Sequence, residues 1–237
     1  IMSGAENGDL RWFNKTYTRI ILGDKKIKKY CDGIDVHSYF THLPFPAPFN
    51  DRVAFMKRWR KYLDRRFPLE KVRVSEWTHM KGGRDSGMDS ALEQARVMFE
   101  DMTVLNAVSW QHWIAVSDVD YCDGLIYVDP DRSYEITKRY YAFGNFSKFI
   151  VRGDVRVGIS GSDDNVKLIA FRNANEIKIV AINLSKDCVE LDLSAVAERG
   201  KAVITDDERS LYECDFENGF TLSPRSVTTL LANVGEV

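Results

Sequence analysis

The sequence has 237 residues, of which 44% are hydrophobic and 29% are charged, and its formal net charge is −2 at pH 7. This composition is typical of an ordinary folded protein of one or two domains. The near-neutral charge and the lack of a long basic run exclude nucleic acid and an anionic membrane surface as expected partners. No apolar run approaches the about 18 residues of a membrane-spanning helix, so we expect no membrane span.

The cysteines, at positions 31, 122, 188 and 214, match no Cys-x-x-Cys or Cys/His metal spacing. We therefore expect no metal ion and no other cofactor. Cys188 and Cys214 fall in one later segment and are one candidate disulfide, whereas free buried cysteines are the other expected state. The sequence begins with Ile1 and shows no readable targeting segment, so the compartment stays open.

Helix-like and strand-like patterns alternate along the first part of the chain. Strands are predicted at residues 1–6, 32–40, 71–79 and 107–116, and helices at residues 12–22, 51–67, 86–106 and 137–150. Alternation of this kind predicts a parallel sheet whose crossover connections are helices. A long acidic loop at residues 117–133 precedes the last helix, and loops beyond about 12 to 15 residues are often functional.

Residues 71–79, K-V-R-V-S-E-W-T-H, are the stretch around which the chain is organised. Alternation along a strand predicts two faces, one with Val72, Val74 and Glu76 and the other with Arg73, Ser75 and Trp77. A carboxylate at the carboxyl end of a barrel strand indicates catalysis, which makes Glu76 the candidate catalytic residue. The alternative is a solvated glutamate at a strand end.

A different pattern begins near residue 151, where short alternating segments follow one another without helices. Strands are predicted at residues 155–160, 166–172, 177–184, 189–193, 202–205, 211–214, 220–222 and 227–232. Turn sequences such as Asn218-Gly219 separate them. These features predict an all-β domain, most simply an antiparallel β-sandwich.

Five segments in a fixed order carry a family resemblance. They are V-H-S-Y at 36–39, V-S-E-W at 74–77, S-W-Q-H-W at 109–113, D-G-L-I at 123–126 and I-T-K-R-Y-Y-A-F-G-N-F-S-K-F-I at 136–150. Together they resemble glycoside hydrolase family 30 over nearly the whole chain. The resemblance implies an α/β plus all-β fold. Residues 1–150 would be the C-terminal part of a (β/α)8 TIM barrel, from the end of strand five to helix eight, and residues 151–237 an antiparallel β-sandwich.

The resemblance also implies roles for residues at the strand ends. Glu76 becomes the nucleophile on strand seven, and His37 and Tyr39 lie at the end of strand six. These two side chains are suited to hydrogen-bond the nucleophile or a sugar hydroxyl. The alternative is a structural pair at the rim of the barrel.

Residues 110–113 become strand eight in the same comparison. Trp113 shares strand parity with Gln111, so both are candidates to face the barrel mouth, where an indole stacks on the apolar face of a sugar. Trp77 follows the nucleophile and is either such a stacking surface or a packing residue. His79 and His112 are more typical of ordinary polar positions. The expected partner is a carbohydrate substrate.

The sequence departs from the family pattern in one respect. A retaining glycosidase needs two carboxylates about 5 to 5.5 Å apart, and the family's acid/base glutamate follows an asparagine on strand four, which this sequence lacks. Glu6 in A-E-N has these residues in the wrong order on the wrong strand. We therefore expect a catalytically incomplete chain, with the missing N-terminal half of the barrel as a candidate partner.

The resulting expectation is a retaining β-glycosidase acting on a β-linked polysaccharide or glycoside. The W-Q-H-W and D-G-L-I segments are most similar to family members acting on β-1,6-linked galactan or glucan, and the resemblance is compatible with secretion. One alternative is a non-catalytic carbohydrate-binding or assembly remnant, which the absent acid/base favours. Another is an unrelated α/β hydrolase, which leaves the sandwich unexplained and lacks a G-x-S-x-G elbow.

Overall fold

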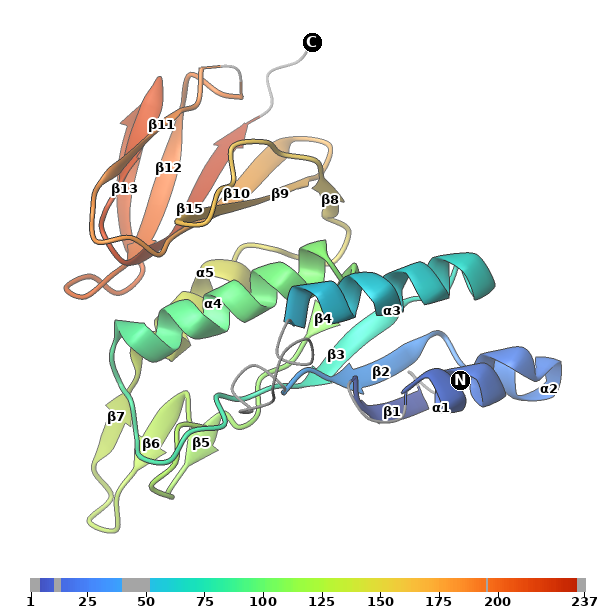
Figure 1. The fold of residues 1–237 in the computed structure, drawn as a ribbon. Coiled ribbons are helices and arrows are strands. Elements are labelled where there is room, and N and C mark those ends of the chain that lie inside the picture. Colours follow the sequence, from blue (N-terminus) through green and yellow to red (C-terminus); the bar gives the residue numbers. More distant parts are fainter. Residues whose placement is uncertain (1–4, 11–13, 40–51, 195, 234–237) are drawn as a thin grey trace. The chain divides into compact units, whose positions relative to one another are not determined.

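The computed structural model describes residues 5–10, 14–39, 52–194 and 196–233, and Figure 1 colours it from blue at the N-terminus to red at the C-terminus. Its contacts divide the chain into two compact units. The first contains residues 1–84, 100–115 and 120–124, and the second contains residues 85–99, 116–119 and 125–237. The helix α4 (Met88–Thr103) begins in the second unit and ends in the first.

The first unit is built on a parallel sheet. Its strands follow one another in space as they do in the chain, in the order β1 (Ala5–Asp9), β2 (Ile34–His37), β3 (Val72–Glu76) and β4 (Ala107–Trp110). In the sequence, α1 (Asn14–Gly23) and α2 (Lys25–Lys28) separate β1 from β2, and α3 (Arg52–Arg66) separates β2 from β3. Parallel neighbours need such crossover connections, so the expected β/α alternation is confirmed.

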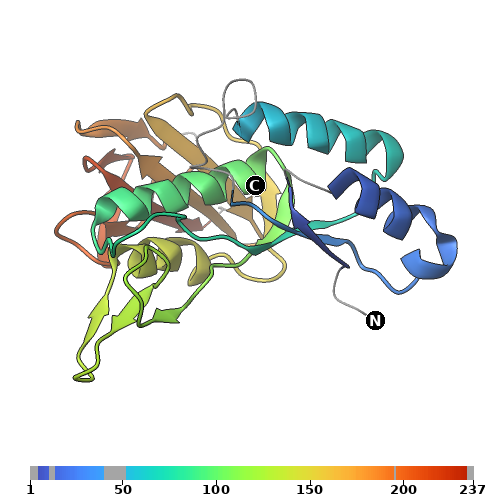
Figure 2. The same cartoon turned by 60° about the horizontal axis from the view of Figure 1, so that its bottom comes forward.

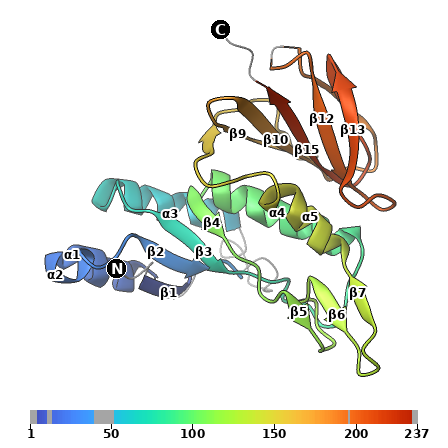
Figure 3. The ribbon, with the colours of Figure 1, turned by 180° about the vertical axis from the view of Figure 1, so that it is seen from behind.

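One face of this sheet and one stripe of α3 are buried. The buried positions are Ile34, Val36, Val72 and Val74 on the strands, and Arg52, Met56, Trp59 and Leu63 on α3. The opposite views of Figures 1 and 3 both draw α3 on the same side of β2 and β3. The apolar spacing that predicted the helix therefore identifies its buried stripe. Trp12, Phe40 and Asp51, at the ends of predicted elements, lie outside the described residues.

Gly33 fixes the point where β2 begins. Its φ is +138°, and a Cβ atom at this position would lie 2.5 Å from the carbonyl oxygen of Lys71. The next residue, Ile34, donates its backbone N–H to that same oxygen at 3.0 Å. The close approach of the two strands therefore requires a residue without a side chain.

The second unit contains an antiparallel sandwich, as the run of short strands predicted. Its larger sheet has the order β13 (Tyr212–Glu217), β12 (Arg199–Thr205), β15 (Ser226–Asn233), β10 (Glu176–Asn183), β9 (Val166–Arg172) and β8 (Val155–Val157). The smaller sheet pairs β11 (Val189–Asp192) with β14 (Gly219–Leu222). Figure 2 shows these strands from another side. Leu168, Ile179, Phe216 and Leu222 belong to the apolar core that both sheets share.

The helix α5 (Lys138–Ser147) packs against the larger sheet, on β12 and β15. Asn145 is fully buried, and its side-chain amide donates to the carbonyl of Val203 at 2.8 Å and to the hydroxyl of Thr229 at 3.1 Å. A small sheet of β5 (Val116–Ser117), β6 (Ile126–Val128) and β7 (Tyr134–Ile136) precedes α5. Within residues 117–133, which were predicted as a long loop, this sheet contains Ser117 and β6, and the rest of the segment has no strand.

The cysteines are free; Cys122 is buried, whereas Cys188 is exposed. Cys188 and Cys214 are both described and form no disulfide, so that candidate pair is not present. Over the described ranges, each helix is too short or too polar to cross a membrane. In the same residues, no group of three or more His, Cys, Asp or Glu side chains is placed to hold a metal ion.

Candidate active site

A β-bulge in β3 sets the direction of the Glu76 side chain. Val36 lies opposite Val74, but the next pair along the two strands is His37 opposite Glu76. Ser75 is therefore an extra residue on β3. Strict alternation would place Glu76 on the face of Val74, whereas the bulge turns it to the face of His37. The sequence-based prediction of this face is wrong for that reason.

Three predicted site residues meet at the carboxyl edge of the parallel sheet. The Tyr39 hydroxyl donates a hydrogen bond to Oε1 of Glu76, and Nδ1 of His37 lies 3.7 Å from the same oxygen. The rings of His37 and Tyr39 stand edge to face, with centroids 5.5 Å apart. The side chains of His37 and Glu76 are 26% and 24% exposed, so a solute can reach the carboxylate.

This arrangement suits a carboxylate that acts as a nucleophile. A hydroxyl group that donates to one carboxylate oxygen fixes the orientation of the group and leaves the second oxygen for reaction. When protonated, His37 also forms an ion pair with Glu76. The site therefore offers an oriented, partly exposed carboxylate with two neighbours that respond to its charge.

The face of the sheet that carries Glu76 also carries an ion pair between β2 and β3, formed by residues that precede the site in each strand. Nε of Arg73 lies 2.6 Å from Oδ1 of Asp35, and Nη1 of Arg73 lies 3.7 Å from Oδ2 of Asp32. Arg73 and Asp35 are opposite one another on β3 and β2. Arg73 therefore shares a face with Glu76, and the prediction that the two side chains point to opposite faces is corrected by the bulge.

The pairing of β3 with β4 continues beyond the strands. The N–H of Gln111 donates to the carbonyl of Val74 at 2.9 Å, and the N–H of Trp113 donates to the carbonyl of Trp77 at 2.8 Å. Gln111 is exposed and Trp113 is 51% exposed, so a solute can reach both. Trp77 has no exposed surface, and its ring centroid lies 5.7 Å from that of Trp110. Trp77 thus has the surroundings of a packing residue and no surface for a sugar.

His79 and His112 belong to the aromatic cluster around Trp77. Their ring centroids lie 6.4 Å and 6.2 Å from that of Trp77. Nε2 of His112 is 2.7 Å from the carbonyl oxygen of Asp123. Both histidines therefore have surroundings that fit ordinary structural positions.

Sequence reasoning missed a buried polar cluster next to the strand ends. Asp101 on α4 and Ser38 after β2 have no exposed surface, and the guanidinium of Arg52 on α3 contacts both. Burial raises the pKa of Asp101, although the charge of Arg52 and hydrogen bonds from Trp110 and Ser38 favour its ionised form. One signal was present in the sequence, because Ser38 is a polar residue on the apolar face of β2.

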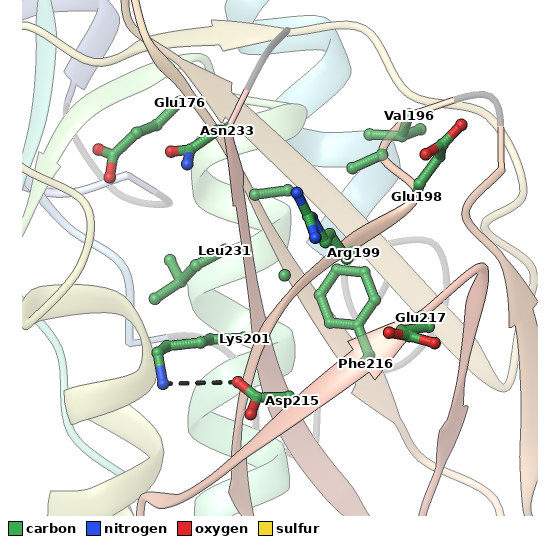
Figure 4. Close-up of a pocket in the computed structure, with 13 residues that line it drawn as sticks. Glu176, Val196, Glu198, Arg199, Lys201, Asp215, Phe216, Glu217, Leu231 and Asn233 are labelled. Atoms are coloured by element: carbon green, nitrogen blue, oxygen red, sulfur yellow. Dashed lines mark hydrogen bonds and ion pairs between the residues drawn. The ribbon is translucent and has the colours of Figure 1, made fainter.

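A groove with a volume of about 860 Å³ lies in the sandwich (Figure 4). Its charged lining residues are Glu176, Glu198, Arg199, Lys201, Asp215 and Glu217. Phe216, the aromatic residue in the lining, is only 6% exposed and offers little surface for stacking on a sugar. The lining belongs to the second unit, whereas Glu76 belongs to the first. Size alone does not make this groove the active site, and we place the candidate site at Glu76.

A parallel β/α sheet with an oriented carboxylate at its carboxyl edge is typical of barrel enzymes. A sequence model described as O-Glycosyl hydrolase family 30 matches residues 8–127, just over half of the chain. The chain therefore belongs to glycosyl hydrolase family 30.

Three of the proteins that match the chain by sequence or by structure illustrate the similarity. The chain is 25% identical over 195 residues to the lysosomal acid glucosylceramidase of Mus musculus, a match that covers 78% of this chain and 37% of that protein. A conserved exported protein from Bacteroides fragilis superimposes with a TM-score of 0.79 at 21% identity, covering 95% of this chain and 54% of that chain. A GH30 endoxylanase from Clostridium papyrosolvens C71 superimposes with a TM-score of 0.72 at 20% identity, covering 98% of this chain and 56% of that chain.

These matches bear on the fold and on the extent of the chain. The superpositions confirm the expected architecture, the C-terminal part of a (β/α)8 barrel followed by an antiparallel β-sandwich. The chain spans 37% to 56% of the length of the three proteins.

Proposed function

We propose that this chain is the C-terminal part of a retaining β-glycosidase and that Glu76 is its nucleophile. In this proposal residues 1–150 are the partial barrel and residues 151–237 are the side sandwich. The observation that carries it is the hydrogen bond from Tyr39 to Glu76 at the carboxyl edge of the sheet, where barrel enzymes place their catalytic residues. Membership of family 30 supports it.

The proposed first step joins the sugar to the protein. Glu76 attacks the anomeric carbon through Oε2 while the bond to the leaving oxygen breaks, and a glycosyl ester forms on the carboxylate. Tyr39 holds Oε1 and so directs Oε2. A general acid must protonate the leaving oxygen, and the same group then activates the water that releases the sugar. We propose that a barrel segment outside this sequence supplies this group.

The sugar ring is proposed to lie between Glu76 and the exposed residues that follow β4. Trp113 offers half of its surface for stacking on the ring. Gln111 presents both a donor and an acceptor for sugar hydroxyls, and His37 is close enough to the carboxylate to contact a hydroxyl of the same ring. We do not propose a sugar contact for Trp77, because it is fully buried.

The proposed substrate is a β-linked polysaccharide or glycoside. The W-Q-H-W and D-G-L-I segments make β-1,6-linked galactan and glucan the first substrates to test. Two of the similar proteins are named a glucosylceramidase and an endoxylanase. Glucosylceramide and xylan are therefore the comparison substrates to assay beside the β-1,6-linked polymers. The enzyme completed with its barrel half should release product fastest from the β-1,6-linked polymers, and faster release from xylan or glucosylceramide would contradict the choice of linkage.

The nucleophile is tested by trapping the glycosyl ester. A 2-deoxy-2-fluoro glycoside with a good leaving group needs little protonation, so the ester should form even without the general acid. Peptide mass spectrometry of the labelled chain should locate the sugar on Glu76, and the Glu76→Gln variant should take up none. Glu70→Gln, which removes a carboxylate paired with Lys28, is the matched control and should label normally. A label on another carboxylate, or inverted product by NMR, would refute the assignment.

A second candidate is a non-catalytic carbohydrate-binding module. The exposed Trp113 favours it, because an accessible indole binds sugar whether or not catalysis follows. In that case the chain should bind the same oligosaccharides by calorimetry, lose that binding in Trp113→Ala, and accept no fluoro-sugar label. Labelling of Glu76 would exclude this alternative.

A further inference from the structure

One buried carboxylate connects the ends of two strands of the parallel sheet. Asp101 on α4 has no exposed surface. The hydroxyl of Ser38 lies 3.0 Å from its Oδ1 and 2.9 Å from its Oδ2, and the indole N–H of Trp110 donates to Oδ2 at 2.9 Å. Trp110 is the last residue of β4, and Ser38 directly follows β2. Asp101 therefore contacts both strands where they end at the candidate site.

Arg52 adds the helix α3 to the contact that already joins α4, β2 and β4. Its guanidinium donates to Oδ1 of Asp101, to the hydroxyl of Ser38, and to Oε2 of Glu100 at 2.6 Å. Arg52 is 5% exposed and Glu100 is 7% exposed, so these charge-assisted hydrogen bonds are shielded from water and strengthened. The groups facing Asp101 in these contacts are donors. A side-chain amide could not replace the carboxylate here, because its NH2 group is itself a donor.

Ser38 transmits this contact to the candidate active site. It lies between His37 and Tyr39, the two residues that approach Glu76. Its backbone N–H donates to the carbonyl of Glu76 at 3.2 Å, so Ser38 is held by Asp101 through its side chain and by Glu76 through its backbone. Successive side chains of an extended chain point to opposite faces. Holding Ser38 on the buried face therefore directs its two neighbours to the face of Glu76.

We propose that Asp101 is a positioning residue for the Glu76 site. Its carboxylate fixes Ser38 and Trp110 at the ends of β2 and β4, and Ser38 in turn sets His37 and Tyr39 against Glu76. The effect on catalysis rests on the proposed function, whereas the effect on the position of Tyr39 does not. The two claims are therefore separable by measurement.

The test uses the Asp101→Asn variant of the 237-residue chain, with 13C-labelled tyrosine and 15N-labelled tryptophan. Tyr39→Phe and Trp110→Phe assign the two reporter resonances. In Asp101→Asn the Cζ resonance of Tyr39 should move toward its position in Glu76→Ala, where the hydrogen-bond acceptor is gone. The indole N–H resonance of Trp110 should move as well. The rate of fluoro-sugar labelling of Glu76 should fall by about 10²-fold, the usual effect of a misplacement of about 1 Å.

Two controls separate positioning from general loss of packing. Leu63→Ala removes a fully buried side chain of α3 and should destabilise the fold while leaving the Tyr39 resonance in place. Ser38→Ala should reproduce the shift seen in Asp101→Asn, whereas Ser38→Thr keeps the hydroxyl and should restore the parent resonance. If Asp101→Asn does not fold, this pair of Ser38 variants decides the question.

The outcomes distinguish the two claims. A folded Asp101→Asn or Ser38→Ala variant with the parent Tyr39 resonance and labelling rate would overturn the positioning role while leaving Glu76 as nucleophile. A shifted Tyr39 resonance in a chain that takes up no label, even as the parent, would support positioning and refute the proposed function.

Discussion

Tyr39 is the residue on which the orientation of Glu76 depends most directly, because its hydroxyl donates to Oε1. We expect Tyr39→Phe to slow formation of the glycosyl ester by about 10²-fold, the usual loss when one donor at a reacting centre is removed. The loss should fall on the labelling rate at saturating reagent, with little change in the half-saturating concentration. Tyr30→Phe, at a side chain that is 56% exposed, is the control. An unchanged labelling rate in Tyr39→Phe would remove Tyr39 from the mechanism.

The buried pair of Asp154 and Lys178 gives a prediction about stability and pH. Lys178 Nζ lies 2.8 Å from Asp154 Oδ2, with side chains 6% and 1% exposed. Burial alone would raise the pKa of Asp154, but hydrogen bonds from Lys178, from the Val151 N–H and from Asn173 hold this pKa below its ordinary value of 3.8. The stability from this group is therefore fully present above pH 3.8 and is lost as the pH falls through the lowered pKa.

We expect Asp154→Asn to lower the free energy of unfolding at pH 7 by about 3 kcal/mol, the low end of the cost of breaking a buried ion pair. The buried Lys178 then keeps only Glu176, whose carboxylate lies 3.5 Å away and is 48% exposed. Urea titrations at pH 7 and at pH 3 measure this loss, and the variant should lose less than the parent on acidification. Asp164→Asn, at an exposed position, should change neither value. Equal stability of parent and Asp154→Asn at pH 7 would contradict the prediction.

At the residue scale, the sequence pointed to candidate site residues at the ends of strands or just beyond them. Glu76, His37 and Tyr39 could be found because each sits within a local pattern that ends at one sheet edge. Asp101 could not, because its partner Ser38 is 63 residues away. A hydrogen bond between residues far apart in the sequence produces no periodic pattern. The one indication was the serine on an apolar strand face, because a buried polar group needs a hydrogen-bond partner.

The bulge in β3 leads to a prediction about deletion and insertion. Without Ser75, Glu76 would follow Val74 directly, and ordinary alternation would place it opposite His37 on the face that it occupies now. We expect a chain lacking Ser75 to keep the labelling rate within about tenfold of the parent, since the side-chain period of two is preserved. An alanine inserted between Val74 and Ser75 should abolish labelling. Loss of labelling in the deletion variant would show that the bulge itself is needed.

Element types followed from the sequence, whereas their detailed pairing did not. The apolar spacing of α3 and the alternation of β2 were sufficient to identify a helix and a strand with a buried face each. The extra residue in β3 was invisible, because V-R-V-S-E alternates as a regular strand would. The bulge depends on how β3 meets β2, and that pairing is a property of two segments together.

At the scale of the whole molecule, the sequence pattern changes near residue 151 from alternating helix and strand periods to strand periods alone. This change predicted a parallel β/α sheet followed by an antiparallel β-sandwich. Apolar residues recur every 3.6 positions on the buried side of a helix and every 2 positions on the buried side of a strand. This pattern can be read without any sequence motif. The groove in the sandwich, whose lining residues fall between Glu176 and Asn233 in the sequence, was not predicted. Its lining comes from strands that are neighbours only in the folded sheet.

The parallel sheet gives a prediction about the chain in solution. In the part of the first unit that the structure describes, β1 and β4 stand at the two ends of the sheet and each pairs with one other strand. Unpaired strand edges promote association. We expect size-exclusion chromatography with light scattering to show concentration-dependent association and calorimetry to show a broad transition. A monomer with one sharp transition at high temperature would be the contrary result.

Gly33 has a consequence for heritable variation. Every single-nucleotide missense change in a glycine codon introduces a residue with a Cβ atom, and at this position that atom would lie 2.5 Å from the carbonyl oxygen of Lys71. The positive φ strains any such residue as well. Natural or laboratory variants at codon 33 should therefore appear among loss-of-activity alleles, although Gly33 precedes the first residue of β2 and the candidate site lies at the other end of that strand. Such alleles would report on the spacing of β2 from β3 and not on the proposed chemistry at Glu76.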